Sequence, residues 1–316
     1  MDVLQIRNLN LSFLISGKEY QALHNINLEL KKGEMLAIVG ESGCGKTISA
    51  MSVLQLLPQN AIITSGEIIY NGNNLLKYSD KEMQKIRGKE IALVPQDPMT
   101  ALNPLLSIGE QISEVIETHQ NIKGHEAEKK VIEVLDKVKI PDAKNRLKSY
   151  PHEFSGGMRQ RVIIAAALAC NSEIIIADEP TTALDVTVQA QITDLLKELQ
   201  KESGTSYIFI SHDFGLISEI ADDVAVMYAG HVVEKASAKK VLETPLHPYT
   251  QALLKALPDF ETKELTPIYG QPPSVTDEFK GCFFAPRCEK KKDCCENSEP
   301  NISNTDGSSV ACFLYK

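Results

Sequence analysis

Apolar and polar residues alternate with a period of two over the first part of the chain. Side chains of a β-strand point alternately to the two faces of a sheet, so this pattern predicts half-buried antiparallel strands. The apolar positions are Val3, Leu4, Ile6, Leu9, Leu11 and Phe13, followed by Ile26, Leu28 and Leu30.

Short uninterrupted apolar runs replace this alternation after Gly33. Strands that are covered on both faces have continuous apolar sequences, and segments of helical length separate these runs. The sequence therefore predicts an α/β fold with a parallel core and an antiparallel β subdomain. The runs are residues 35–39, 91–94, 174–177, 207–210 and 224–227.

The segment between the second and third runs has the spacing of helices. Its apolar residues recur every three or four positions, which predicts a helical lobe over about residues 97–160. From residue 236 onward prolines are frequent, and we expect a linker at 267–274. The predicted domains are residues 1–235 and a C-terminal extension at 236–316. The helical apolar residues are Ile112, Val115 and Ile116, then Val131, Val134, Leu135 and Val138.

Composition narrows the classes of function. The 316 residues correspond to about two domains, and 33 basic against 42 acidic residues give a net charge of −9. This charge argues against a broad basic face for nucleic acid, and the absence of Trp argues against stacking on single strands. The longest apolar run, residues 162–170, is shorter than the ~20 residues that cross a bilayer. With no signal-peptide pattern at the N-terminus, we expect a cytoplasmic protein.

A glycine-rich motif directly follows the first apolar run. Residues 40–47 fit the pattern G-x-x-x-x-G-K-[ST], and a helix-like stretch follows at 48–57. Glycines let successive backbone N–H groups approach phosphate oxygens, and the helix N-terminus favours negative charge. We interpret Cys44 as a tolerated small residue rather than a redox switch. The motif consists of Gly40, Glu41, Ser42, Gly43, Cys44, Gly45, Lys46 and Thr47.

Two adjacent carboxylates end the apolar run at 174–177. Placing Asp178 and Glu179 at the end of a buried strand is unfavourable unless a cation or a water network uses them. We expect Asp178 to hold Mg²⁺, and Glu179 to orient and deprotonate an attacking water. Together with the glycine-rich motif, these acids predict a nucleoside triphosphate hydrolase.

A Ser-Gly-Gly turn shortly before that strand resembles the signature of the ABC transporter ATPases. In that family the turn opens a helix and contacts the γ-phosphate of an ATP held by the other subunit. Phe154 and Met158 flank the turn here, where the commonest form has Leu and Gln, but Ser155, Gly156 and Gly157 are in place.

The other elements of the family follow in chain order. Gln96 matches the Q-loop, Asp185 ends the Ala-Leu-Asp of the D-loop, and His212 matches the switch histidine. Phe13 is the expected adenine-stacking aromatic, with Tyr20 as the alternative. The resemblance implies catalytic roles for Glu179, His212, Gln96 and Lys46, nucleotide contacts from residues 40–47, Phe13, Ser155, Gly156, Gly157 and Asp185, and Mg²⁺ ligation by Thr47, Gln96 and Asp178.

Longer stretches are similar to the dipeptide and oligopeptide importers and their nickel and metallophore relatives. These are residues 94–104, 180–187, 246–250 and 281–288. The resemblance implies an ATP-hydrolysing importer subunit for peptides, with nickel or metallophores as the alternative cargo. The implied fold is a P-loop ABC ATPase core with an antiparallel β subdomain, a helical lobe and a small cysteine-rich C-terminal extension.

The same resemblance implies partners. These are a homologous second ATPase subunit in a heterodimer, two membrane-spanning permease subunits, and an extracellular or periplasmic substrate-binding protein. The chain would lie peripherally on the cytoplasmic face of the membrane. A soluble ABC ATPase acting on nucleic acid or ribosomes is less favoured, because the chain has neither coiled-coil insertions nor a second ATPase unit and its charge is negative. The importer-like tail also argues against an exporter.

Five of the seven cysteines lie in the last 35 residues. In a reducing compartment such a cluster indicates a metal site before it indicates disulfides. Four thiolates suit Zn²⁺ or an iron–sulfur cluster, although structural zinc usually has tighter pairs. Some of the resembling subunits bind a [4Fe–4S] cluster at this spacing, which favours that cluster over zinc, with unligated thiols as the third interpretation. The expected ligands, at about 282–312, are Cys282, Cys288, Cys295 and Cys312, with Cys294 as the spare.

Overall fold

The computed structural model describes residues 2–182, 184–256, 267–277 and 279–315. The chain divides into two compact units. The first contains Met1–Leu30, Met35–Leu76 and Ser211–Lys316, and the second contains Lys31–Glu34 and Lys77–Ile210.

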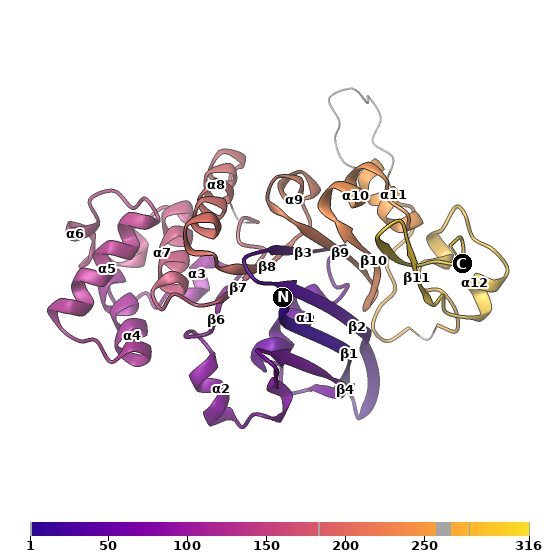
Figure 1. Cartoon of the computed structure of the whole chain (residues 1–316), viewed down its shortest axis with the longest axis horizontal. Helices are drawn as coiled ribbons and strands as arrows, with labels where there is room; N and C mark the ends of the chain where they lie inside the picture. Colours follow the sequence, from indigo (N-terminus) through magenta and orange to yellow (C-terminus); the bar gives the residue numbers. More distant parts are fainter. Residues whose placement is uncertain (1, 183, 257–266, 278, 316) are drawn as a thin grey trace. The chain divides into compact units, whose positions relative to one another are not determined.

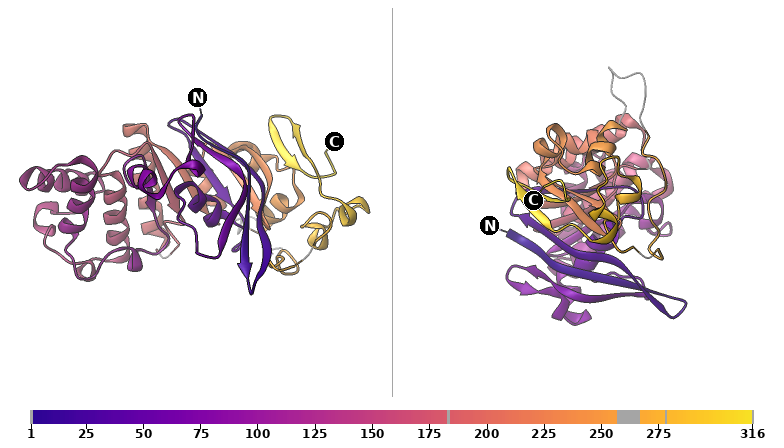
Figure 2. Two further views of the ribbon diagram at one scale, coloured as in Figure 1. Left: turned by 90° about the horizontal axis from the view of Figure 1, so that it is seen from below. Right: turned by 90° about the vertical axis from the view of Figure 1, so that its right-hand side faces the viewer.

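A four-stranded sheet forms one part of the first unit, with the strand order β2-β1-β4-β5. The long strands β1 and β2 run side by side (Figure 2), and β1 pairs antiparallel with β4. Leu9, Leu11, Leu23 and Ile26 are fully buried, so the prediction of half-buried antiparallel strands is confirmed. The bounds are β1 Asp2–Ile15, β2 Lys18–Lys31, β4 Ala61–Tyr70 and β5 Asn73–Asn74.

The remaining strands of the first unit have the order β11-β12-β10-β9-β3. Strand β3 is parallel to β9, and the other pairs are antiparallel. All five residues of β3 are buried, as its continuous apolar run predicts. The bounds are β3 Met35–Val39, β9 Asp223–Tyr228, β10 His231–Ser237, β11 Ile302–Thr305 and β12 Ser308–Ala311.

Helices of the first unit pack with these strands around one apolar core. The core joins Val39 of β3 and Val226 of β9 to Tyr249 and to Phe284 near the C-terminus. The C-terminal part of the chain therefore shares its core with the strand that leads into the glycine-rich motif. The bounds are α1 Lys46–Leu54, α9 Phe214–Ile220, α10 Ala238–Glu243, α11 Pro248–Lys255, α12 Cys294–Asn297 and the 3₁₀ turns η1 Leu75–Lys77 and η3 Ala285–Arg287.

Three parallel strands in the order β8-β7-β6 belong to the second unit. Their parallel pairing confirms the prediction from the apolar runs. Helices α4 to α7 lie together beside them (Figure 1). The strands are β6 Ile91–Val94, β7 Ile174–Asp178 and β8 Ser206–Ser211, and the helices are α2 Asp80–Ile86, α3 Pro98–Ala101, α4 Ile108–Gln120, α5 His125–Lys137, α6 Ala143–Arg146, α7 Gly156–Leu168 and α8 Val186–Ser203, with the 3₁₀ turn η2 Pro151–Glu153.

Local sequence explains where the main helix of the lobe begins. Ser107 caps α4, and the Glu110 carboxylate accepts a hydrogen bond from the Ser107 backbone N–H at 2.8 Å, which completes a capping box. Ile108, Ile112 and Ile116 then line one buried face, as helical spacing requires. Across the described residues, the structure contains no helix with the length and apolarity of a membrane span.

Candidate functional site

The glycine-rich motif forms a loop between β3 and α1. Gly40 has φ of 150° and Gly45 has φ of 104°, values that residues with a side chain rarely adopt. A Cβ on Gly40 would lie 2.1 Å from the carbonyl oxygen of Met227, and one on Gly45 would lie 2.7 Å from Leu23. The loop therefore needs glycine at both positions to curl this closely against β9 and β2.

The side chain of Lys46 folds back into this loop. It is 5% exposed, and its Nζ donates to the carbonyl oxygens of Gly40 at 2.8 Å and Glu41 at 3.1 Å. Lys46 is the first residue of α1, whose first turn contains no acidic residue. The positive side chain and the helix N-terminus together suit an anion. Thr47 follows as an exposed residue.

Cys44 is a buried residue of the loop. Burial raises the pKa of its thiol above the ordinary value of 9.0, so the thiol is neutral near pH 7. A buried neutral thiol is a small packing group rather than a reactive one, which agrees with our interpretation of Cys44.

Polar side chains position the second carboxylate at the end of β7. Asp178 is 4% exposed, and Glu179 follows it with φ of 44°. Glu179 Oε2 accepts hydrogen bonds from Gln96 Nε2 at 3.1 Å and from Thr182 Oγ1 at 2.9 Å. The structure thus brings Gln96 and Glu179 together, as the sequence predicts for one site. Thr182 was not predicted as a site residue, although it lies in the importer-like stretch 180–187 and three residues after the acid.

The Ser-Gly-Gly turn caps α7. The Ser155 hydroxyl accepts from the Met158 backbone N–H at 3.4 Å, which is a standard N-cap. A Cβ on Gly157 would lie 2.4 Å from Val188 Cγ1 in α8, so this glycine allows α7 and α8 to approach each other. Asp185 in turn caps α8 by accepting from the Val188 N–H at 3.0 Å. The structure therefore places the signature beside the D-loop. Ala183 of the D-loop lies outside the described residues.

The remaining predicted nucleotide residues belong to the first unit. His212 is an exposed residue directly after β8. Phe13 is half-buried in β1, opposite Ala61 of β4. Tyr20 is half-buried as well, with Lys18 Nζ 5.1 Å from the centre of its ring. The choice between these two aromatics for adenine stays a prediction.

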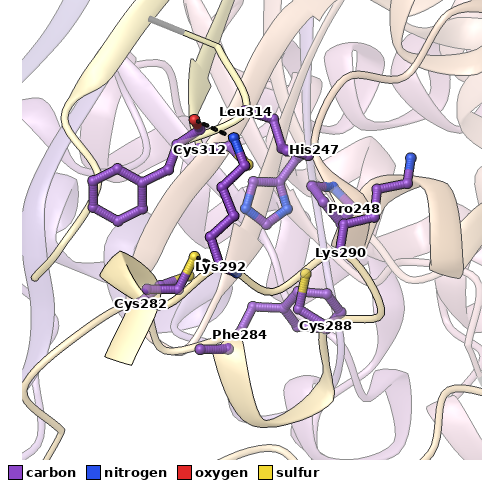
Figure 3. Close-up of a pocket in the computed structure, with 12 residues that line it drawn as sticks. His247, Pro248, Cys282, Phe284, Cys288, Lys290, Lys292, Cys312 and Leu314 are labelled. Atoms are coloured by element: carbon purple, nitrogen blue, oxygen red, sulfur yellow. Dashed lines mark hydrogen bonds between the residues drawn. The ribbon is translucent and has the colours of Figure 1, made fainter. Parts of the chain in front are cut away.

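Four cysteines line one small pocket, together with His247. Figure 3 shows Cys282, Cys288 and Cys312 among the side chains that line this pocket, together with His247 and Lys292. Burial raises the pKa of Cys282 to about 11 and lowers that of His247 to about 3, so both groups are neutral near pH 7. The four are the predicted Cys282, Cys288, Cys295 and Cys312; Cys294 is exposed.

These cysteines share a pocket without forming a coordination site. In the part of the chain that the structure describes, no group of three or more His, Cys, Asp or Glu side chains is arranged to hold a metal ion. The donor types suit a soft metal or a cluster, but these side chains would have to rearrange to ligate one.

Two residues that the sequence analysis missed contact the glycine-rich loop. The Tyr249 hydroxyl accepts from the Glu41 backbone N–H at 2.9 Å. Arg287 donates to both carboxylate oxygens of Glu41, from Nη1 at 2.6 Å and from Nη2 at 2.9 Å. These hydrogen bonds raise the pKa of Arg287 further above its ordinary value. Tyr249 lies in one of the stretches that suggested the peptide importers, but nothing in the sequence assigns it to the loop.

Comparisons with known proteins agree with this assembly of residues. The family model described as ABC transporter matches residues 23–182, and the model described as oligopeptide/dipeptide transporter, C-terminal region, matches residues 233–295. The dipeptide transport ATP-binding protein DppD of Bacillus subtilis is 47% identical over 99% of this chain and 94% of its own length. The oligopeptide transport ATP-binding protein OppD of the same species is 50% identical over 90% of this chain and 81% of its own.

A solved structure has a similar fold. The ATP-binding cassette MJ0796, a dimer in a post-hydrolysis state with ADP and Pi, superposes with a TM-score of 0.67 at 30% identity. That match covers 74% of this chain and 98% of the cassette. The phosphate loop, the acidic strand end and the Ser-Gly-Gly turn thus occur in a chain that resembles ABC proteins over nearly its whole length. The chain belongs to the ABC transporter ATPase family and carries the C-terminal region of the oligopeptide and dipeptide transporters.

Proposed function

We propose that this chain is the ATP-hydrolysing subunit of an importer for di- or oligopeptides. The observation that carries the proposal is the near full-length identity of 47% to a dipeptide transport ATP-binding protein, joined to a complete set of phosphate-site motifs. The reported relatives are named for dipeptide and oligopeptide transport, so peptides are favoured over nickel or metallophores. ATP and Mg²⁺ are the ligands that an ATPase of this family requires.

The loop residues act on the phosphates. Lys46 carries its charge inside the loop, where its Nζ now contacts two carbonyl oxygens that phosphate oxygens would replace as partners. The Thr47 hydroxyl, the Gln96 amide oxygen and the Asp178 carboxylate are oxygen ligands of the kind that Mg²⁺ prefers. Bound Mg²⁺ neutralises charge that develops on the phosphates. Phe13 is assigned to the adenine.

Glu179 acts as the base. Its carboxylate is held by Gln96 and Thr182, so one oxygen is oriented before water arrives. The water oxygen attacks the γ-phosphorus, the bond to the β–γ bridging oxygen breaks, and the proton of the water passes to Glu179. His212 donates a hydrogen bond to the γ-phosphate. Such phosphoryl transfer depends on positioning and charge stabilisation more than on covalent catalysis.

The signature makes the reaction depend on a second subunit. Ser155, Gly156 and Gly157 at the start of α7 serve the γ-phosphate of an ATP held by the facing ATPase, and Asp185 beside them takes part in that contact. We assign the facing position to a homologous ATPase in a heterodimer. Two permease subunits and a substrate-binding protein complete the importer, which places this chain peripherally on the cytoplasmic face of the membrane.

Nucleotide binding and membrane association test this proposal. Lys46→Ala should weaken binding of a fluorescent ATP analogue by more than about tenfold, because the buried charge of the loop is lost. Lys32→Ala is the matched control, since Lys32 pairs on the surface with Glu173 at 3.1 Å. Chain isolated from its host should co-purify with membrane proteins. Co-purification with ribosomes or DNA would instead support the soluble ABC ATPase.

We further propose that the cysteine pocket takes up a metal centre. The support is that Cys282, Cys288, Cys295 and Cys312 line one pocket while Cys294 is exposed. A [4Fe–4S] cluster is favoured over Zn²⁺ on the resemblance, and ligation would release the thiol protons and further stabilise this segment.

Metal analysis of the purified chain tests this second proposal. Anaerobically purified protein should contain iron and acid-labile sulfide, which Cys295→Ser should lose and Cys294→Ser should keep. Stoichiometric zinc without iron would replace the cluster by a zinc site. Purified protein that contains neither iron nor zinc would have four unligated thiols and would refute the proposal.

A further inference from the structure

An arginine of the C-terminal region lies against the phosphate loop. Arg287 ends the 3₁₀ turn η3, directly before Cys288, and it is separated from Glu41 by 246 positions. Its side chain is 4% exposed, whereas that of Glu41 is 26% exposed. The two form a bidentate pair, which is the strongest common geometry between arginine and a carboxylate.

Each nitrogen of the Arg287 guanidinium donates a hydrogen bond. Besides Glu41, its Nη1 donates to the Tyr228 hydroxyl at 3.3 Å and its Nε donates to the Tyr269 carbonyl oxygen at 3.1 Å. The guanidinium carbon lies 5.7 Å from the centre of the Tyr228 ring. Tyr228 and Tyr249 pack on each other with ring centres 4.6 Å apart. Arg287 is therefore fixed in place, and it holds the Glu41 side chain.

The charge of Glu41 explains why such a partner is needed. Glu41 is the second residue of a loop whose backbone and Lys46 suit anions, so a bare carboxylate there would repel phosphate. The guanidinium of Arg287 neutralises the Glu41 carboxylate through two hydrogen bonds. The Tyr249 hydroxyl accepts a hydrogen bond from the Glu41 backbone N–H. Carboxylate and backbone of the same loop residue are thus both bound by residues from the C-terminal part of the unit.

We propose that Arg287 is a positioning residue for ATP binding: its pairing with Glu41 removes a repulsive charge from the phosphate loop and fixes the shape of the loop. The C-terminal region thereby contributes to nucleotide affinity without touching the nucleotide. The hydrogen bonds of η3 connect the same turn to the cysteine pocket, because the Ala285 N–H donates to the Cys282 carbonyl oxygen at 2.9 Å and the Arg287 N–H donates to that of Phe284 at 3.0 Å.

A double-mutant cycle on the full chain tests this role. Arg287→Met should weaken binding of a fluorescent ATP analogue by about tenfold, because it leaves a partly buried carboxylate unpaired in the loop. In the Glu41→Gln background the same Arg287→Met change should alter affinity less than about twofold, since no unpaired charge remains. Lys291→Met is the matched control, because Lys291 pairs with Glu296 on the surface of the same region at 2.7 Å.

Two further measurements separate positioning from folding. Thermal unfolding shows whether each variant is folded. If Arg287→Met does not fold, Arg287→Lys replaces it, since lysine keeps the positive charge but cannot form the bidentate pair. The affinity of Arg287→Lys for the ATP analogue should fall about threefold. In the assembled transporter, Arg287→Met should raise the KM for ATP while kcat at saturating ATP stays within about twofold. An unchanged affinity in folded Arg287→Met, or an equal loss in both Glu41 backgrounds, would overturn the proposal.

Discussion

The close approach of α7 and α8 at Gly157 predicts that the two signature glycines differ in their contribution to stability. Gly157→Ala should destabilise the chain, because the new Cβ would lie 2.4 Å from Val188 Cγ1. Gly156→Ala should not, since its Cβ would lie 3.5 Å from Leu184 Cδ2, an ordinary contact. Packing therefore requires glycine at position 157 but not at position 156.

The magnitude follows from packing. Forcing a methyl group into a filled site costs about 1–3 kcal/mol, and alanine in place of glycine within a helix returns about 0.5–1 kcal/mol. We therefore expect Gly157→Ala to lose about 1–2 kcal/mol of the free energy of unfolding. Gly156→Ala should gain about 0.5–1 kcal/mol, since only the helix propensity changes there.

Shortening the Val188 side chain should remove the destabilisation that Gly157→Ala causes. Val188→Ala deletes the Cγ1 that the new methyl group would meet, so Gly157→Ala in that background should be close to neutral. Chemical unfolding of the four chains of this cycle, followed by circular dichroism, measures the coupling. Equal stability of Gly156→Ala and Gly157→Ala, or the same penalty with and without the Val188 methyl groups, would refute this packing argument.

Three further predictions concern turnover and pH. Glu179→Gln should keep ATP binding and abolish hydrolysis in the assembled complex, and near wild-type ATPase activity would contradict the base assignment. The isolated chain should hydrolyse ATP slowly and with more than first-order dependence on its concentration, because the signature serves another subunit; fast first-order hydrolysis by a monomer would contradict this. Burial lowers the pKa of His24 and His231 to about 4, below their unfolded value near 6.5, so the unfolded state binds more protons and stability should fall as pH drops from about 6.5 towards 4. His231→Gln should flatten this fall in unfolding titrations whereas exposed His125→Gln should not, and parallel curves for wild type and His231→Gln would refute the linkage.

The pattern of apolar residues was sufficient to predict strands that are buried on both faces or on one face along their whole length. Residues 35–39 form a continuous apolar run, and all five are buried in β3. The alternation along β1 and β2 likewise reflects one buried face. Strand β4 was missed, because its apolar residues occur in adjacent pairs, such as Ile62 and Ile63, and its pairing with β1 is irregular near Asn10. Strands β11 and β12, with four residues each, are too short to show a period, and β10 carries charged residues next to its few apolar ones.

The candidate site was predictable where a motif fixes both residue type and spacing. Lys46, Glu179 and the Ser155 turn are of this kind, and Gln96 does contact Glu179. The pair of Glu41 and Arg287 was not predictable, since two ordinary charged residues far apart in sequence carry no local signal of their contact. The Tyr249 hydroxyl is a similar case, because only the packing of α11 brings it to the loop.

Peptide transport in proteoliposomes is the most direct test of the proposed function. Vesicles would hold the complete transporter, with this chain facing the outside and the binding protein enclosed within, so that import corresponds to exit of an enclosed peptide. We predict that added ATP drives labelled dipeptide or oligopeptide out of the lumen with the wild-type chain and not with Glu179→Gln. Movement that is independent of ATP, unaffected by Glu179→Gln, or directed into the lumen would contradict an ATP-driven peptide importer.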